Sequence, residues 1–233
     1  GISEIKVHKT PTVKVLTTGS ELIKPGAKII EGQVYEANTF MLQAALNSVD
    51  IEPSVSLLQD DLEETKEAIK KALNDFDIVI LSGGISVGDY DFVKEALEAN
   101  EVKELFYKVK QKPGKPLFFG KKDKKLIFAL PGNPAAALNC FYAYVLSGIN
   151  IQRGTPNPFL RKIEVPINQA YKKKSGRAEF LKAITDFKNV ELLGGQGSDV
   201  LLSFSKANCL VFLNDEKDSV EQGDVVEVHL LPE

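Results

Sequence analysis

From Val13 to Leu146, runs of apolar residues alternate with segments of helical periodicity. In chain order these segments are VKVLTT (13–18), Thr39–Leu46, PSVSLL (53–58), Leu62–Leu73, DIVILS (77–82) and Val93–Leu97. The alternation predicts a mostly parallel sheet with helices on both faces, because crossover helices allow parallel strands to lie side by side. The uninterrupted apolar run Ile78–Leu81 is typical of an interior strand. We therefore expect an α/β fold, a three-layer sandwich.

Further along the chain, the pattern predicts two more strands and a long helix. The strands PLFFG (116–120) and KLIFAL (125–130) flank a charged turn, and the turn LPGNP (130–134) opens a helix at Ala135–Leu146. The segment INIQRGTPNP (149–158) then loses the periodicity and contains two prolines, which predicts a linker.

The rest of the chain has a different pattern. Short strands with period-two alternation, such as RKIEVPI (161–167) and VVEVHLL (225–231), predict a small, mostly β domain that resembles a barrel. We expect an α/β domain at residues 1–155 and this second domain at residues 156–233.

The composition limits the class of protein. The chain has 29 basic and 32 acidic residues, mixed along its length, which argues against a surface dedicated to nucleic acid. Cys140 and Cys209 are far apart and form no C-x-x-C pattern, so we expect buried thiols in a reducing, cytoplasmic environment. The most apolar stretch, Ala135–Ile151, is too short and too interrupted to span a membrane, and no signal peptide is apparent. The first residue is Gly1 and the only methionine is Met41, so we expect the chain to begin inside a longer polypeptide.

Several turns rich in glycine and acidic residues follow the predicted strands. They are TTGSEL (17–22), QDD (59–61), SGGISVGDYD (82–91) and the pair KPGKP (112–116) and LPGNP (130–134). In open parallel sheets, ligands bind in the crevice beyond the carboxyl ends of the strands. We therefore expect these turns to form one rim around a ligand.

Acidic residues of three separate turns are the candidate catalytic groups. Glu21, Asp60 and Asp91 each come just after a predicted strand, so the sheet would bring them towards one crevice. Carboxylates gathered there repel each other unless a cation lies among them, and Mg²⁺ prefers oxygen ligands, with Asp60 and Asp91 as its candidate ligands. Taken singly, an acid in such a turn is more often a helix cap or a solvated side chain, and Asp61 and Asp91 are each placed to cap the helix that follows.

Small, polar and basic residues of the same turns are the candidates for ligand binding. They are Thr18, Gly19, Ser20, Ser82, Gly83, Gly84, Ser86, Gly88, Lys112, Lys115, Pro116, Pro131, Gly132, Asn133 and Pro134. Glycines allow backbone N–H groups to approach a phosphate, and helix N-termini add positive potential there. The lysines supply formal positive charge, although either could be an ordinary surface lysine.

The same sequence offers one alternative from another class of enzyme. Residues 84–88, GISVG, satisfy the G-x-S-x-G pattern of a serine hydrolase, with Ser86 as nucleophile. His229, however, is embedded in a predicted strand of the second domain, with no loop to deliver it to Ser86. The pattern is short and recurs by chance, so we treat the hydrolase as the lesser hypothesis.

Several stretches of the chain form a set of motifs in a fixed order: TVKVLTTGSELIKPG, IIEGQVYEANTFML, LLQDDLEE, VILSGGISVGDYDFVKEAL, KPGKPLFFG, LPGNPAAALNCF, GRAEF, LLSFSKANCLVFL and EQGDVVEVHLL. In sequence and in order, these motifs resemble the molybdopterin molybdenumtransferase family, which comprises the bacterial MoeA proteins and the E domain of gephyrin. The resemblance covers nearly the whole chain. The related molybdopterin adenylyltransferases share the glycine turn but are a poorer match after it.

The resemblance implies a function in molybdenum cofactor biosynthesis. Members of the family insert molybdate into adenylylated molybdopterin, with magnesium, and release AMP. Glu21, Asp60 and Asp91 match the family's functional acids, and Pro131 and Pro134 match its two site prolines. Residues that match the molybdate pocket of some members are Lys112, Lys115, Pro116, Arg177 and Ser203, of which the last two come from the second domain.

The resemblance also implies that part of the protein is missing from this chain. Members of the family carry further domains before the segment that begins here at Gly1. The resemblance also implies a homodimer, with a site that is completed near the contact between protomers. We therefore expect a fragment that binds the pterin but is weak or inactive alone, with a molybdopterin adenylyltransferase as a possible partner. The alternatives are a molybdopterin-binding scaffold without catalysis, as in gephyrin, and a molybdopterin adenylyltransferase.

Overall fold

The computed structural model describes residues 1–85, 92–174 and 176–232. Three residues of the predicted site, Ser86, Gly88 and Asp91, lie outside the described residues. The helix cap and the ligand contacts expected of them stay predictions.

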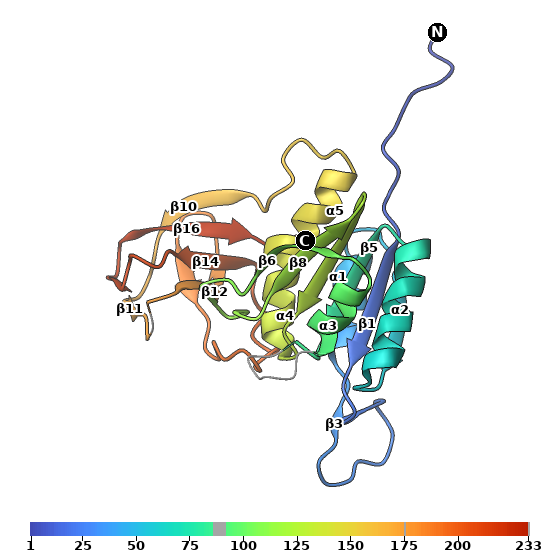
Figure 1. Cartoon of the computed structure of the whole chain (residues 1–233). Helices are drawn as coiled ribbons and strands as arrows, with labels where there is room; N and C mark the ends of the chain where they lie inside the picture. The colour runs from blue at the N-terminus through green and yellow to red at the C-terminus, as the bar shows by residue number, and fades with distance from the viewer. Residues whose placement is uncertain (86–91, 175, 233) are drawn as a thin grey trace.

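A six-stranded sheet forms the centre of the first part of the chain (Figure 1). Its strands, in the order in which they lie side by side, are β4 (Ser54–Leu58), β1 (Val13–Thr18), β5 (Ile78–Ser82), β9 (Lys125–Leu130), β8 (Phe118–Lys122) and β6 (Lys103–Tyr107). β4, β1, β5 and β9 run parallel, whereas β8 and β6 are each antiparallel to their neighbours. The predicted mostly parallel sheet is confirmed.

Helices cover both faces of this sheet. One face carries α2 (Leu62–Asp75) and α3 (Phe92–Ala99), and the other carries α1 (Asn38–Asn47) and α4 (Pro134–Cys140). The position of β5 between the two helical layers explains why its sequence is a continuous apolar run. Ile78 and Ile80 belong to the core beneath α1 and α4, and Val79 and Leu81 belong to the core beneath α2 and α3. All four side chains are fully buried. The structure is therefore the expected three-layer α/β sandwich.

The helix that begins with α4 is longer than the sequence pattern predicts. It continues through a π-helical turn, η1 (Phe141–Val145), into α5 (Leu146–Gln152), so the first residues of the predicted linker are helical. Ile149 is fully buried in the core, which extends the apolar face by one turn. The helix ends where Gly154 takes a positive φ of 69° and its N–H donates to the Ile151 carbonyl.

The second part of the chain forms an antiparallel sheet. Its strands, in spatial order, are β10 (Lys162–Pro166), β16 (Val225–Leu230), β14 (Cys209–Leu213), β12 (Ala178–Thr185) and β13 (Val190–Leu192). One parallel bridge, between Ile167 and Val190, brings the two edges of this sheet together. The remaining short strands are β2 (Leu22–Ile23), β3 (Val34–Tyr35), β7 (Gln111–Lys112), β11 (Tyr171–Lys172) and β15 (Ser219–Val220).

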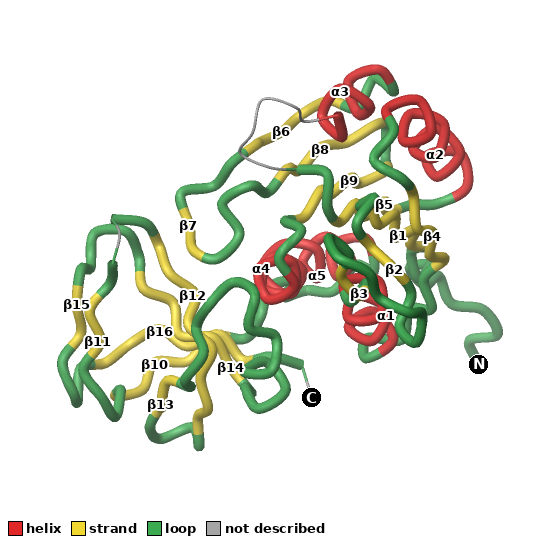
Figure 2. The backbone as a smooth tube through the Cα atoms, turned by 90° about the horizontal axis from the view of Figure 1, so that it is seen from below, coloured by secondary structure: helices red, strands yellow, loops and turns green. Residues whose placement is uncertain are grey.

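The two sheets are connected through α4, α5 and the strand β7. Figure 2 shows α4 and α5 between the two sheets. β7 belongs to the first part of the chain but pairs in parallel with β12 of the second sheet, and the Ala178 N–H donates to the Lys110 carbonyl at 3.1 Å. Phe180 and Phe204 share one core with the residues of α4. The KPGKP turn is thereby fixed against the second sheet.

Both cysteines are buried and form no disulfide, as expected. Burial raises the pKa of each thiol, Cys140 and Cys209, to about 12. Among the residues that the structure describes, no helix is both long enough and apolar enough to cross a membrane.

Candidate functional site

The predicted turns meet at one edge of the first sheet. The parallel strands β1, β4, β5 and β9 all end at this edge, and β8, which runs the other way, starts there directly after KPGKP. Between the turns lies a cavity of about 850 Å³, which we call the rim cavity. The predicted site residues that line it are Thr18, Gly19, Glu21, Asp60, Gly83, Gly84, Lys115, Pro116, Pro131, Gly132, Asn133, Pro134 and Arg177.

Asp60 connects two of these turns. Its Oδ2 accepts a hydrogen bond from the Ser20 backbone N–H at 2.8 Å, and its own N–H donates to the Ser20 Oγ at 3.1 Å. The neighbouring Asp61 is the helix cap that the sequence predicts: its Oδ1 accepts a hydrogen bond from the Glu64 N–H at 2.7 Å at the start of α2. The structure thus separates two adjacent acids: Asp60 lines the cavity, and Asp61 caps the N-terminus of α2.

The glycine pair after β5 allows the first and third turns to touch. Gly83 has φ of 87°, and a Cβ there would lie 2.3 Å from the backbone carbonyl oxygen of Thr18. Gly84 has φ of 64°, and a Cβ there would lie 2.7 Å from the Thr18 Oγ1. Only glycine fits this close approach in a left-handed conformation.

Two residues that sequence reasoning did not select, Asn38 and Glu36, also line the rim cavity. The Asn38 Nδ2 donates to the Ser82 Oγ at 2.9 Å and to the Gly132 carbonyl at 2.7 Å, so one side chain connects the start of α1 to the turns after β5 and β9. Glu36 is buried and accepts from the Thr39 N–H at 2.7 Å at the start of α1. Both belong to the stretch IIEGQVYEANTFML. The sequence feature that could have identified them is the presence of two polar residues just before the predicted helix at Thr39–Leu46.

Two buried polar atoms at this cavity have no hydrogen-bond partner among the described residues. They are the Oδ1 of Asn38 and the Oγ1 of Thr18. Polar atoms buried in this way are usually paired, with protein, water or a ligand. The observation favours a site that another molecule completes.

A smaller cavity of about 270 Å³ opens beside the first, and we call it the side cavity. It shares Lys115, Pro131 and Arg177 with the rim cavity and adds Lys112. Three basic residues line it, Lys112, Lys115 and Arg177, and no acidic residue does among those that the structure describes. Its charge is therefore suited to an anion.

The second domain contributes Ser198 to the side cavity rather than the predicted Ser203. Ser198 lines the cavity, and its Oγ accepts from the Asn133 Nδ2 at 2.9 Å. The Ser203 Oγ instead donates to the Gly195 carbonyl at 2.9 Å and lines neither cavity. The two serines are close in sequence, and the conformation of the loop decides which one lines the cavity.

The loop that carries Ser198 is held by a buried lysine. Lys182 of β12 is 3% exposed, and its Nζ donates to the carbonyls of Gly195 (2.7 Å), Gly197 (3.2 Å) and Val200 (3.0 Å). Burial lowers the pKa of Lys182. The sequence gives no sign of this arrangement, because a lysine in an alternating strand is usually exposed.

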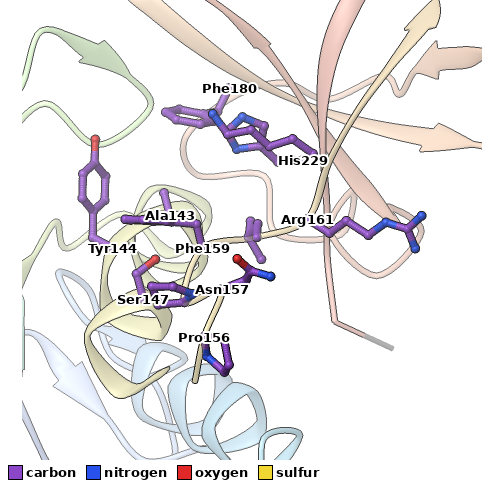
Figure 3. Close-up of a pocket in the computed structure, with 12 residues that line it drawn as sticks. Ala143, Tyr144, Ser147, Pro156, Asn157, Phe159, Arg161, Phe180 and His229 are labelled. Atoms are coloured by element: carbon purple, nitrogen blue, oxygen red, sulfur yellow. The ribbon is translucent and has the colours of Figure 1, made fainter. Parts of the chain in front are cut away.

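A further cavity, of about 890 Å³, lies between the helix formed by η1 and α5 and the second sheet, and His229 lines it (Figure 3). None of the predicted site residues that the structure describes lines it, apart from His229 of the hydrolase hypothesis. His229 lies in β16, as expected, beside Phe180, and its Nε2 is 2.6 Å from the Glu227 Oε1. Burial lowers the pKa of His229. This histidine lines a different cavity from the glycine turn after β5, which disfavours the hydrolase.

The fold and the rim and side cavities define an α/β protein with a crevice at its strand ends that both acidic and basic side chains line. Comparison with known families specifies the class further: residues 14–153 match the family "Probable molybdopterin binding domain", and residues 164–231 match "MoeA C-terminal region (domain IV)". The chain belongs to this molybdopterin-binding family, and the resemblance noted in the sequence is confirmed.

Individual relatives agree with the family. The chain is 35% identical over 245 residues to the molybdopterin molybdenumtransferase of Haemophilus influenzae, covering 99% of this chain and 60% of that protein. It is 30% identical over 235 residues to the enzyme of the same name from Staphylococcus aureus, covering 99% of this chain and 56% of that protein. The crystal structure of a molybdopterin biosynthesis MoeA protein from Pyrococcus horikosii superposes with a TM-score of 0.79 at 29% identity, covering 95% of this chain and 54% of that one. The chain therefore spans little more than half the length of these relatives.

Proposed function

We propose that this chain provides the pterin-binding and oxyanion-binding part of a molybdopterin molybdenumtransferase. In this function, the rim cavity takes adenylylated molybdopterin and the side cavity takes molybdate, and their reaction releases AMP. The observation that carries the proposal is the union of both cavities at one edge of the sheet, where they share Lys115 and Arg177.

The residues of the two cavities differ in a way that suits two ligands. Gly83 and Gly84 allow the first and third turns to close on each other at the rim cavity, and Glu21 and Asp60 add acidic groups to it. Lys112, which lines only the side cavity, adds positive charge there. A doubly charged tetrahedral oxyanion would be held by charge-assisted hydrogen bonds from such residues.

Magnesium fits the donors of the rim cavity. Mg²⁺ is usually bound by one or two carboxylates together with substrate phosphates and water, and Glu21 and Asp60 are carboxylates that line this cavity. The described residues do not by themselves bring three acidic, histidine or cysteine side chains together as a metal site. Asp60 and Glu21 would hold the ion, with Asp91 as a further candidate ligand, and the ion would neutralise the charge of the pyrophosphate.

The protein's own contribution is positioning and charge. Asp60 fixes the first turn through Ser20, and Asn38 fixes the third and fourth turns, so the two substrates would meet in a constant geometry. Lys115 lies where the cavities join and would stabilise negative charge on the leaving phosphate. A pure scaffold has no need of acids at this edge, which favours the enzyme over the gephyrin-like alternative.

Binding of adenylylated molybdopterin to the chain tests the proposal. We expect the wild-type chain to bind the pterin in the presence of Mg²⁺, and Glu21→Gln and Asp60→Asn to weaken binding by about tenfold or more, which corresponds to about 1.4 kcal/mol. Glu63→Gln, an exposed acid of α2, is the matched control and should bind like wild type. AMP release by the chain should be far slower than by the longer protein, because we expect missing domains to complete the site. Failure of the wild-type chain to bind the pterin would overturn the proposal.

A further inference from the structure

Glu179 is a fully buried carboxylate, at 0% exposure, that the proposed function does not use. It lies on β12, directly across from Lys112 in the parallel pairing of β7 with β12. Its Oε1 is 3.3 Å from the Lys112 Nζ, and its Oε2 accepts a hydrogen bond from the Tyr171 hydroxyl at 2.7 Å. Burial, together with the neighbouring Glu179, raises the pKa of Tyr171, so this hydroxyl stays a donor.

The position of this carboxylate is informative because a buried ion is stable only beside partners. Its ionic partner Lys112 is 35% exposed in its side chain and lines the side cavity, whereas Glu179 does not. The Lys112 ammonium therefore lies between a buried negative charge behind it and the cavity in front. An anion in that cavity would interact with the whole pair, attracted by Lys112 and repelled by Glu179.

We propose that Glu179 is a positioning residue that fixes Lys112 at the wall of the side cavity and weakens its attraction for a bound oxyanion. The inference rests on the proposed function, in which this cavity takes the oxyanion. An oxyanion that is a substrate must leave its site when it is transferred, so binding that is as tight as possible gives no advantage. Because it is paired with Glu179, Lys112 is held in one position and attracts an anion less strongly than an unpaired lysine would.

Charge scaling makes the proposal measurable. The interaction of Glu179 with a bound ion is proportional to the charge of that ion. Tungstate and perrhenate are tetrahedral oxyanions of similar size that carry two charges and one charge, so they sense the same pair with different strength. If Glu179→Gln tightens perrhenate threefold, tungstate should tighten about ninefold, since the free energy doubles.

The experiment measures both dissociation constants by isothermal titration calorimetry at constant ionic strength, for the wild-type chain and three variants. We expect the ratio of tungstate to perrhenate affinity to follow the charge of the pair: highest in Glu179→Gln, intermediate in wild type and in the double variant Lys112→Gln/Glu179→Gln, and lowest in Lys112→Gln. Tyr171→Phe keeps both charges and should keep the wild-type ratio. If Glu179 acted only on folding, its substitution would change the tungstate and perrhenate affinities by the same factor and leave their ratio constant.

The outcomes separate this inference from the proposed function. If the wild-type chain binds neither ion, the side cavity is no oxyanion site and the proposed function fails there. If it binds them but Lys112→Gln and the double variant show equal ratios, Glu179 has no influence on the ligand and the inference is wrong. Lys112→Gln leaves the buried Glu179 without its ionic partner, whereas Glu179→Gln leaves only a partly exposed lysine. If Lys112→Gln does not fold, the comparison of wild type with Glu179→Gln decides the matter, because equal ratios in these two would likewise refute the inference.

Discussion

The two walls of the site are built in different ways. On the α/β side, the turns that line the rim cavity follow β1, β4, β5 and β9, so the hydrogen-bonded ladder of the sheet sets where each turn lies. On the side of the second domain, Ser198 lies on a loop, residues 193–208, which contains no strand or helix. Its conformation depends on single side chains, chiefly Lys182 and Gln196.

The difference teaches where each wall is vulnerable. A turn at the end of a strand inherits the stability of the sheet, so a change there affects the fold and the site together. A loop held by a few side chains can lose its shape while the sheets remain intact. Substitutions in the first wall should therefore change stability strongly, and substitutions in the second should change ligand binding more than stability.

The largest effect is expected for Gly83→Ala in the first wall. The new methyl group would lie 2.3 Å from the Thr18 carbonyl oxygen, in a backbone conformation with φ of 87°. Backbone strain alone costs about 1–3 kcal/mol, and the clash forces β1 and β5 apart at the site, so we expect a loss above about 3 kcal/mol in the free energy of unfolding. Chemical denaturation measures it.

Gly26→Ala is the matched control for this change. Gly26 has nearly the same φ, 89°, but a Cβ there meets no atom within 4 Å. It should show only the cost of the left-handed conformation, about 1 kcal/mol. Equal losses in the two variants would mean that the contact between the turns does not matter.

The second wall should respond to Lys182→Met. The variant removes a charged donor from three loop carbonyls, and hydrogen bonds to charged groups contribute about 1.5–3 kcal/mol each, offset by the relief of a buried charge. We expect a net loss of about 2 kcal/mol in the free energy of unfolding and a larger relative loss of oxyanion affinity. Lys206→Met, an exposed lysine of the same loop, should change neither quantity. A variant that keeps wild-type oxyanion affinity would show that Lys182 does not hold the loop.

Two serines of the loop, Ser198 and Ser203, should give smaller effects of opposite kinds. Ser198→Ala removes a polar group from the side cavity and the partner of Asn133, so tungstate affinity should fall about fivefold with little change in stability. Ser203→Ala removes a buried hydrogen bond to Gly195 and should lower stability by about 1 kcal/mol with little change in affinity. The reverse result would restore Ser203 as the ligand-binding serine. Calorimetry and denaturation of both variants distinguish the cases.

The same contrast explains how much the sequence alone could predict. Strand ends are visible as the points where apolar runs stop, so Glu21, Asp60 and the glycine pair were placed correctly at one edge. The cap at Asp61 was predictable for the same reason, since its partner is three residues away. Local pattern therefore sufficed for the first wall.

The second wall could not be predicted from pattern, because its contacts are not local. Lys182 reaches carbonyls 13 to 18 residues away, and no periodicity shows that this lysine points inward. Asn38 was missed on similar grounds, since its partners Ser82 and Gly132 lie 44 and 94 residues further along the chain. The helix through Gln152 was predicted too short because burial of Ile149, and not local propensity, extends it.

The smallest effect concerns the pH dependence of the second domain, whose interior contains His229 at 12% side-chain exposure. Burial holds the pKa of His229 below its ordinary value of 6.5, although Glu227 partly opposes the shift. The unfolded chain therefore binds the proton more readily than the folded chain in the window just below pH 6.5, so the free energy of unfolding falls as the pH drops through that window. Wild type should lose more stability than His229→Gln between pH 7 and about pH 5. The free energy of unfolding is compared only above about pH 5, because the pKa of Glu227 is also shifted and protonation of Glu227 would change the stability at lower pH. If the stability of His229→Gln depends on pH in the same way as that of wild type, the folded domain does not disfavour the charged imidazole.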